Sequence, residues 1–240
     1  NLFFNPSAPY LPAKRVREDY EAAKSTIAHV IGAKGADLII TAGATESINL
    51  AFTVCRPYLK STDNRQANPK TTTAKHLNIA NIPNAGSSTH LPQSSDSQPP
   101  RILTIPTEHA AVLESAKPFG AIFASVDSAG LVDLADFRAK LSPDIVLVTI
   151  SLANNELGTI QPLSELAEII RTERQNRLAK GNTTPLYFHT DASQAANLID
   201  INVARLGVDL LTLNAAKCGG PKGVGALSFA HGIKIQPLSV

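Results

Sequence analysis

The chain has 240 residues, enough to bury a substantial hydrophobic core in one large domain or two small ones. Its formal net charge of +2 at pH 7 gives no strong basic field, so we expect neither a nucleic-acid-binding protein nor a membrane-surface protein. Its two cysteines, Cys55 and Cys218, are too few for a disulfide scaffold or a cysteine-rich zinc site, and we predict no metal site.

The N-terminal residues Asn1–Pro6 do not form the basic region and apolar stretch of a secretory signal. No apolar run reaches the ~18 residues that a membrane span needs. The chain contains no methionine, so we expect a processed or truncated piece of a longer protein. Composition favours the cytoplasm and leaves an organelle open.

Apolar residues on one helical face predict a helix over residues 14–31. Residues 37–41 (DLIIT) predict a strand, which leads through a turn into a helix near residue 48. Residues 61–101 differ in kind, because they are rich in Ser, Thr, Asn, Gln and Pro and contain no aromatic residue. We expect a disordered surface insertion there, with a linker between two domains as the alternative.

Beyond this segment, short apolar runs alternate with helical patterns. The expected strands cover residues 102–105, 121–126, 145–150, 186–189, 210–213 and 224–229. The expected helices cover residues 110–116 and 134–141, and a third runs from Pro162, as its first residue, to about residue 178. This alternation predicts an α/β fold with three layers, α/β/α, around a mostly parallel sheet. Ligands of such sheets bind at the carboxyl ends of the strands.

Three features at those strand ends could carry chemistry. Gly43-Ala44-Thr45 opens a helix, where backbone N–H groups and a hydroxyl suit a phosphate; an ordinary turn capped by Thr45 is the alternative. Asp191 follows a strand and could keep a ring nitrogen protonated; it could also be a helix N-cap. Lys217 lies between an apolar strand and a glycine-rich turn, where it could form an imine or be a solvated loop lysine.

Their order along the chain is specific. The segments GATESINLA, TEHAAVL, NNELGTIQP, HTDASQ and KCGGPKGVGAL together resemble the class V aminotransferase superfamily, and within it the cysteine desulfurases of iron–sulfur assembly. The resemblance covers nearly the whole chain outside residues 61–101. It implies the fold type I of transferases that depend on pyridoxal 5'-phosphate (PLP). Residues 1–240 would form the PLP-binding large domain, incomplete at both ends, with the insertion at residues 61–101.

The resemblance also implies the catalytic residues. Lys217 matches the lysine that binds PLP covalently, and Asp191 matches the carboxylate on its pyridine nitrogen. His109 matches the histidine that stacks on the ring and helps proton transfer; on its own it would be read as a structural histidine.

Other residues match positions that hold the cofactor. Gln194 matches the side chain on the phenolic oxygen, and Asn155 matches one near that oxygen and the substrate carboxylate. Ala44 and Thr45 match the phosphate-binding turn. Asn214 stands where the family often has serine and could still donate a hydrogen bond to the phosphate.

Some positions depart from the family. Ala216 stands where the family often has histidine and cannot donate, so phosphate affinity could be weaker. The family's opening segment would precede Asn1. Its small domain, with the substrate-binding arginine and the cysteine that accepts sulfur, would follow Val240. We interpret Cys218 and Cys55 as small packing residues rather than nucleophiles.

The resemblance implies a PLP-dependent cysteine desulfurase. Such an enzyme takes sulfur from L-cysteine, leaves alanine, and holds a persulfide for iron–sulfur cluster or thio-cofactor synthesis. It implies a homodimer and a sulfur-acceptor or scaffold protein as partner. Two alternatives stay open: another class V PLP enzyme, such as a selenocysteine lyase or an aminotransferase, and a non-catalytic scaffold of the same fold.

Overall fold

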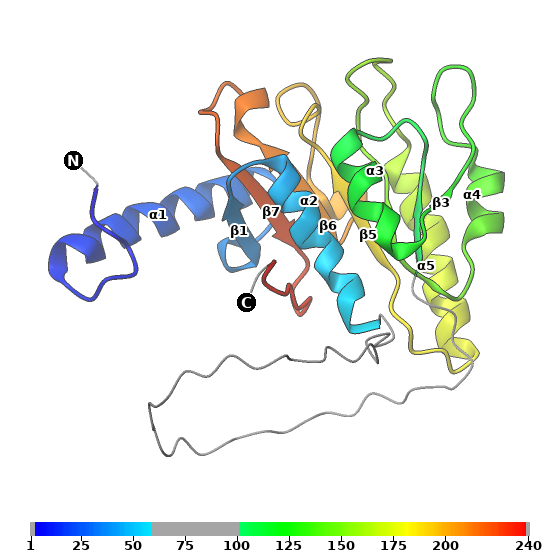
Figure 1. Cartoon of the computed structure of the whole chain (residues 1–240), viewed down its shortest axis with the longest axis horizontal. Helices are drawn as coiled ribbons and strands as arrows, with labels where there is room; N and C mark the ends of the chain where they lie inside the picture. Colours follow the sequence, from blue (N-terminus) through cyan, green and yellow to red (C-terminus); the bar gives the residue numbers. More distant parts are fainter. Residues whose placement is uncertain (1–2, 59–100, 239–240) are drawn as a thin grey trace, which may run out of the picture.

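The computed structural model describes residues 3–58 and 101–238 (Figure 1). The insertion expected at residues 61–101 lies outside the described residues except for Arg101, which begins a strand. In chain order the elements, with η for a 3-10 helix, are α1 (Leu11–Val30), η1 (Gly35–Asp37), β1 (Leu38–Thr41), α2 (Ala44–Phe52), η2 (Thr53–Tyr58), β2 (Arg101–Thr104), α3 (Ala110–Ala116), η3 (Lys117–Phe119), β3 (Ile122–Phe123), α4 (Leu134–Lys140), β4 (Ile145–Thr149), α5 (Leu163–Ala179), β5 (Tyr187–Asp191), α6 (Val203–Leu206), β6 (Leu210–Asn214), η4 (Ala215–Lys217) and β7 (Gly225–Phe229).

The strands form one seven-stranded sheet in the order β1-β7-β6-β5-β4-β2-β3. Strands β2 to β6 pair in parallel wherever they are neighbours. Strand β7 runs antiparallel to both β1 and β6, so β1 points the same way as β6. The mostly parallel sheet predicted from the alternating pattern is confirmed.

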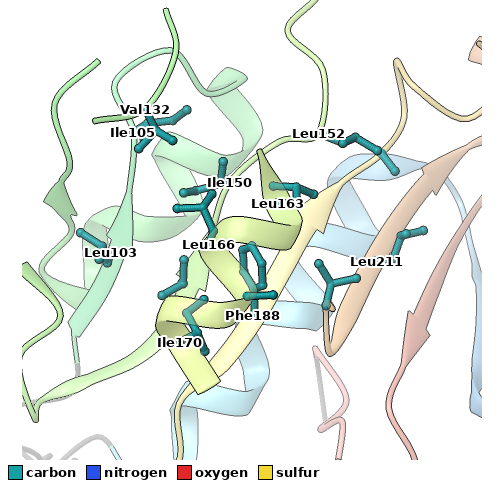
Figure 2. Packing of buried hydrophobic residues seen from close by; sticks show 14 of the residues in the cluster. Leu103, Ile105, Val132, Ile150, Leu152, Leu163, Leu166, Ile170, Phe188 and Leu211 are labelled. Carbon is teal, nitrogen blue, oxygen red and sulfur yellow. The ribbon is translucent and has the colours of Figure 1, made fainter. Parts of the chain in front are cut away.

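Helices cover both faces of this sheet. One core contains Phe137 of α4, Leu166 and Ile170 of α5, and Phe188 and Leu211 of the sheet (Figure 2). A second core on the other face contains buried residues of α2 and α3 packed on alternate strand positions: Ile48, Ala51, Phe52, Val112, Ala116, Ile102, Leu147, Leu210 and Leu227. Burial of alternate strand residues on opposite faces is what a sheet between two helical layers requires.

Strand β4 lies at the centre of this arrangement. All five of its residues are buried, as the continuous apolar run predicts. Each face of a central parallel strand packs against helices, so Ile145–Val148 are all apolar. The polar residue Thr149 at the end of the strand is buried and hydrogen-bonded to His189.

Helix α1 is found where the periodicity predicts a helix, but its apolar side is mostly exposed. Ala13 and Ala28 are its buried residues, and Figure 1 shows the helix reaching well beyond the sheet. The pattern of apolar residues therefore predicts the helix correctly, whereas within residues 3–58 and 101–238 only its last turns pack against the core, next to Ile31.

Two expected boundaries are wrong. The strand expected at residues 121–126 is reduced to Ile122–Phe123 at the sheet edge, followed by an isolated bridge between Val126 and Val132. Pro162 precedes α5 instead of opening it, because its ψ of 65° is not helical.

Among the described residues, no helix combines the length and apolarity needed to cross a membrane. The same residues place no group of three or more His, Cys, Asp or Glu side chains where they could hold a metal ion.

Candidate active site

The candidate site lies along one edge of the sheet. Apart from β7, the strands point in one direction, so their carboxyl ends meet at that edge. The predicted site residues follow those ends: Ala44 and Thr45 after β1, His109 after β2, Asn155 after β4, Asp191 and Gln194 at and after the end of β5, and Asn214 and Lys217 at and after the end of β6. Residues far apart in the sequence are thereby collected in one region.

The turn between β1 and α2 leaves backbone donors free. Gly43 precedes the helix with φ 152°, a conformation that side chains rarely allow, and no side chain caps the helix. A 2.8 Å hydrogen bond between the hydroxyls of Thr41 and Ser47 stabilises the turn. The Ala42 N–H donates to Glu46 at 2.6 Å. The uncapped first N–H groups of α2 can therefore serve an anion.

A hollow of about 720 Å³ opens over this turn. Its lining includes three residues predicted for the phosphate region, Ala44, Thr45 and Asn214, together with the cations Arg56 and Lys222. Positive side chains and helical N–H groups around one hollow favour an anionic ligand.

Strand β7 joins the turn at Gly43, which is predicted to bind phosphate, to the segment that contains Lys217. Gly225 pairs with Thr41 on one side and with Asn214 on the other. A Cβ atom on Gly225 would come 2.6 Å from the carbonyl carbon of Gly43, so the backbone of the turn occupies the space of a side chain. The absence of a side chain at Gly225 thus lets the turn lie against the sheet.

Asp191 ends β5 and is half-buried. Burial raises the pKa of its carboxyl, while hydrogen bonds from Ser193 and the charge of His109 lower it. The Ser193 N–H donates to Oδ1 at 2.9 Å. A carboxylate that is partly removed from water is stabilised by a cationic partner, so Asp191 suits a protonated ring nitrogen.

The layer beneath Asp191 is a buried polar network. His189 lies between Thr149 and Thr212, with ring nitrogens 2.8 Å and 2.9 Å from their hydroxyl oxygens. Burial lowers the pKa of His189 to about 3, so the ring stays neutral. The network ties β4, β5 and β6 together below the strand ends.

His109 is the N-cap of α3. Its Nδ1 atom accepts the Ala111 N–H at 3.1 Å, so the neutral ring carries its proton on Nε2. The exposed ring lines a second hollow of about 730 Å³, which shares Thr45 with the first and has Phe52 and Phe119 in its wall. His109 is therefore oriented by the helix and has one free nitrogen.

The segment after β6 is open. Asn214 Oδ1 accepts the Ala216 N–H at 3.2 Å, which leaves the amide NH₂ group free to donate. Lys217 lies in an exposed turn rather than at the edge of an apolar pocket. Cys218 is exposed, with its Sγ 3.6 Å from the Asn214 carbonyl, so its interpretation as a packing residue is wrong. Its neighbour Lys217 ends the 3-10 turn η4, which contains no buried residue.

Cys55 behaves as predicted. It is fully buried in the core under α2, and burial raises the pKa of its thiol to about 12. Such a thiol packs as a small apolar group.

Asn155 and Gln194 lie in turns at the same edge. Asn155 is exposed and Gln194 half-buried. Together with Asp191 and Lys217, they line neither of the two hollows described above. The structure brings these residues to one edge without enclosing them in a single cavity.

Sequence reasoning missed Glu108. Both of its carboxyl oxygens are hydrogen-bonded to Ser151, one to the N–H at 2.6 Å and the other to the hydroxyl. Burial raises the pKa of Glu108 to about 8, with a smaller contribution from the charge of Asp191 and against the hydrogen bonds from Ser151, which lower it. The motif TEH contains this glutamate, but only the fold shows that it meets Ser151.

Comparison with known proteins places the chain in a family. Residues 94–239 match the family described as aminotransferase class-V. The chain is 36% identical to a cysteine desulfurase IscS of Dictyoglomus turgidum, over 98% of this chain and 49% of that protein. It is 32% identical to a mitochondrial cysteine desulfurase of Saccharomyces cerevisiae, over 91% of this chain and 36% of that protein. The chain thus spans about half the length, or less, of these relatives.

Solved structures show the same fold. A structure described as SspA in complex with cysteine superposes with a TM-score of 0.75 at 26% identity, over 98% of this chain and 56% of that one. A NifS-like protein superposes with a TM-score of 0.74 at 28% identity, over 99% and 54%. Because the family match covers more than half of the chain and the fold agrees with it, this chain belongs to the aminotransferase class-V family.

Proposed function

We propose that the protein containing this chain is a PLP-dependent cysteine desulfurase. It would take sulfur from L-cysteine, leave alanine, and hold the sulfur as a persulfide for iron–sulfur cluster or thio-cofactor synthesis. One observation carries the proposal: Asp191, a half-buried carboxylate, ends a strand at the same edge as the turn at Gly43 and Lys217. The similarity to two cysteine desulfurases supports the choice of reaction.

The residues at this edge fit PLP. The turn at Gly43 approaches the sheet so closely that a Cβ on Gly225 would overlap it, and the helix beyond has free N–H groups for a phosphate. Asp191 supplies the carboxylate that pairs with a pyridinium nitrogen. Asn214 has a free amide group on the same hollow as Thr45, which compensates in part for the missing donor at Ala216.

When bound, PLP supplies a carbonyl carbon that attaches amines covalently and a protonated ring that accepts electrons. Lys217 would hold the cofactor and, once its amine is released, take the proton from the substrate Cα. Asp191 would keep the proton on the ring nitrogen. His109, oriented through Nδ1, would stack on the ring and exchange protons through Nε2.

The remaining predicted residues would orient the cofactor and substrate. Gln194 would bind the phenolic oxygen, and Asn155 would lie near that oxygen and the substrate carboxylate. We do not assign sulfur transfer to Cys55, which is buried, or to Cys218, whose thiol has a pKa raised by partial burial, because the attacking group must be a thiolate.

The proposal extends to the organisation of the protein. Residues 1–240 would belong to the PLP-binding large domain, with an insertion at residues 61–101. A homodimer, a sulfur-acceptor or scaffold protein as partner, and a cytoplasmic location belong to the same proposal.

The test uses the full-length protein. With PLP it should absorb visible light, and with L-cysteine and a reductant it should release alanine and sulfide in equal amounts. Borohydride should fix the cofactor to Lys217. An adduct on Lys222 or Lys180 would refute the assignment of the lysine. Turnover of selenocysteine alone, or dependence on a keto-acid acceptor, would instead identify another class V enzyme.

A non-catalytic scaffold is the second candidate. It is favoured by Ala216, which lines the hollow over the phosphate turn but has no polar side chain to offer. Such a protein would stay colourless after incubation with PLP, so the absorbance measurement separates the two candidates.

A further inference from the structure

Glu108 is a buried acid that the proposed mechanism does not use. Its side chain is 6% exposed, and both oxygens face one residue, Ser151. A carboxyl group that places both oxygens on a single neighbouring residue fixes the distance and the orientation between two segments.

The two segments carry different parts of the candidate site. Glu108 lies in the loop between β2 and α3, directly before His109. Ser151 follows β4, and the next residue, Leu152, donates its N–H to the carbonyl of Asp191 at 3.1 Å. A continuous path of bonded contacts therefore runs from the backbone of His109 through Glu108 and Ser151 to the backbone of Asp191.

A second contact joins the same two loops. The Asn154 side chain donates to the Thr107 carbonyl at 2.7 Å and accepts the N–H groups of Glu156 and Leu157 at 2.8 Å. The loop that contains Asn155 is thus tied to the loop that contains His109 at two points.

Two carboxyl groups lie near each other here, the buried Glu108 and the half-buried Asp191, and ionising both at once is unfavourable. The titratable groups that the described residues place around Glu108 are Asp191, from β5, and His109, the next residue of its own loop. A partner for a ring cation has to be ionised, so Asp191 is the group that carries the charge. The neutral acid form of Glu108 also fits its contacts, since its O–H can donate to the Ser151 hydroxyl while its other oxygen accepts the Ser151 N–H.

We propose that Glu108 is a positioning residue that acts as a neutral carboxylic acid, holding His109 in place relative to Asp191 and leaving Asp191 as the ionised group. This inference rests on the proposed function, because it concerns the same site. The burial that raises the pKa of Glu108 to about 8 agrees with it.

Glutamine is the matched replacement. The amide of Glu108→Gln has the shape of the acid, with an oxygen to accept the Ser151 N–H and an NH₂ group to donate to the hydroxyl. Glu108→Ala removes both contacts. Glu168→Gln, at an exposed glutamate of α5 paired with Arg171, is the control for loss of a surface charge.

The first measurement uses the full-length, PLP-loaded protein and follows exchange of the Cα hydrogen of L-cysteine in D₂O. Glu108→Gln and Glu168→Gln should exchange within about threefold of wild type. Glu108→Ala should be slower by about 10- to 100-fold with little change in KM, since displacing a positioned group by about 1 Å can cost that much. If the alanine variant does not fold, Ser151→Ala, which removes one contact, should change the rate in the same direction.

The second measurement needs no cofactor. The Glu108 carboxyl has a folded pKa of about 8 against an ordinary value of 4.5, so wild type loses stability as the pH rises through that window, and Glu108→Gln does not. The difference in melting temperature between cofactor-free Glu108→Gln and wild type should therefore shift in favour of the variant from about pH 5 to about pH 8. Above that pH the difference should stay constant.

The outcomes separate the two proposals. A wild-type protein that fails to bind PLP refutes the proposed function, while the cofactor-free measurement still tests Glu108. A melting-temperature difference that is flat across the window overturns the neutral acid. Glutamine and alanine variants that are equally slow would show that the negative charge is what matters, and an alanine variant as fast as wild type would show that Glu108 positions nothing.

Discussion

The Nε2 atom of His189 and the Oγ1 atom of Thr212 lie 2.9 Å apart inside the sheet, and neither residue has any exposed surface. Thr212→Val keeps the shape of the side chain but leaves the ring nitrogen without this partner. We expect a loss of ~1–3 kcal/mol in the free energy of unfolding, measured by urea denaturation.

Thr190→Val provides the matched control. Thr190 is equally buried on β5, and within the described residues its hydroxyl has no hydrogen-bond partner. The same substitution there removes no bond and should leave stability unchanged or slightly raised. Equal losses in the two variants would show that the His189 network contributes nothing.

His189 should also make the protein sensitive to acid. Its pKa is about 3 in the folded chain against an ordinary 6.5, so as the pH falls through this window the unfolded chain binds a proton that the folded chain refuses. Wild type should therefore lose stability relative to His189→Phe as the pH falls from about 6.5 to about 4. Taking the difference between the two proteins cancels the opposite contribution of Glu108. Parallel curves for the two proteins would contradict the prediction.

Gly225→Ala should damage the phosphate turn. The added methyl group would come within 2.7 Å of the Gly43 Cα and 2.8 Å of the Thr41 Oγ1, so the turn has to move. We expect a loss of ~1–3 kcal/mol in stability and weaker binding of PLP, followed by its visible absorbance.

The comparison variant is Gly181→Ala, whose φ of +71° strains any side chain but whose Cβ meets no neighbour within 4 Å. It should cost ~1 kcal/mol without altering PLP affinity. If both variants bind PLP like wild type, the close approach at Gly225 does not shape the phosphate site.

Asp191→Asn should separate cofactor binding from chemistry. The amide cannot hold a proton on the ring nitrogen, and loss of one charge-assisted hydrogen bond is worth ~1.5–3 kcal/mol. We expect PLP to remain bound and exchange of the substrate Cα hydrogen to fall by about 10- to 100-fold. Asp200→Asn, at an exposed aspartate paired with Arg205, is the control. Exchange at the wild-type rate would exclude Asp191 as the ring partner.

Cys218→Ala should leave desulfuration intact. The thiol is accessible, but its raised pKa keeps it protonated, and protonated thiols are poor nucleophiles. Alanine release by the full-length variant should match wild type, and mass spectrometry should find the persulfide on another cysteine. A persulfide on Cys218 with matching alanine release would make Cys218 the acceptor.

The sequence predicts the elements of the fold better than their arrangement. The run Ile145–Val148 is apolar throughout, and a strand with that pattern has to be buried on both faces, as β4 is. Nothing in the strand Gly225–Phe229 indicates that it runs antiparallel between β1 and β6, because direction is set by pairing with residues far away in the chain.

The site shows the same division. The motifs place Asp191, His109 and Lys217 after predicted strands. In an alternating α/β fold the carboxyl ends of the strands are where ligands bind, so these positions can be predicted from the sequence. The contact between Glu108 and Ser151 depends on how two loops 43 residues apart meet, and the exposure of Cys218 depends on the shape of a single turn. Neither is encoded in a local pattern, so neither could be predicted.

The position of β7 bears on how the protein is made. Within the described sheet, β1 pairs only with β7, although of these seven strands β1 is synthesised first and β7 last. During synthesis, which proceeds from the N-terminus, the apolar segment Leu38–Thr41 must wait unpaired while the parallel centre of the sheet assembles. A nascent chain with an unpaired strand is a substrate for chaperones, and the side of the candidate site that contains the Gly43 turn can form only after β7 has emerged.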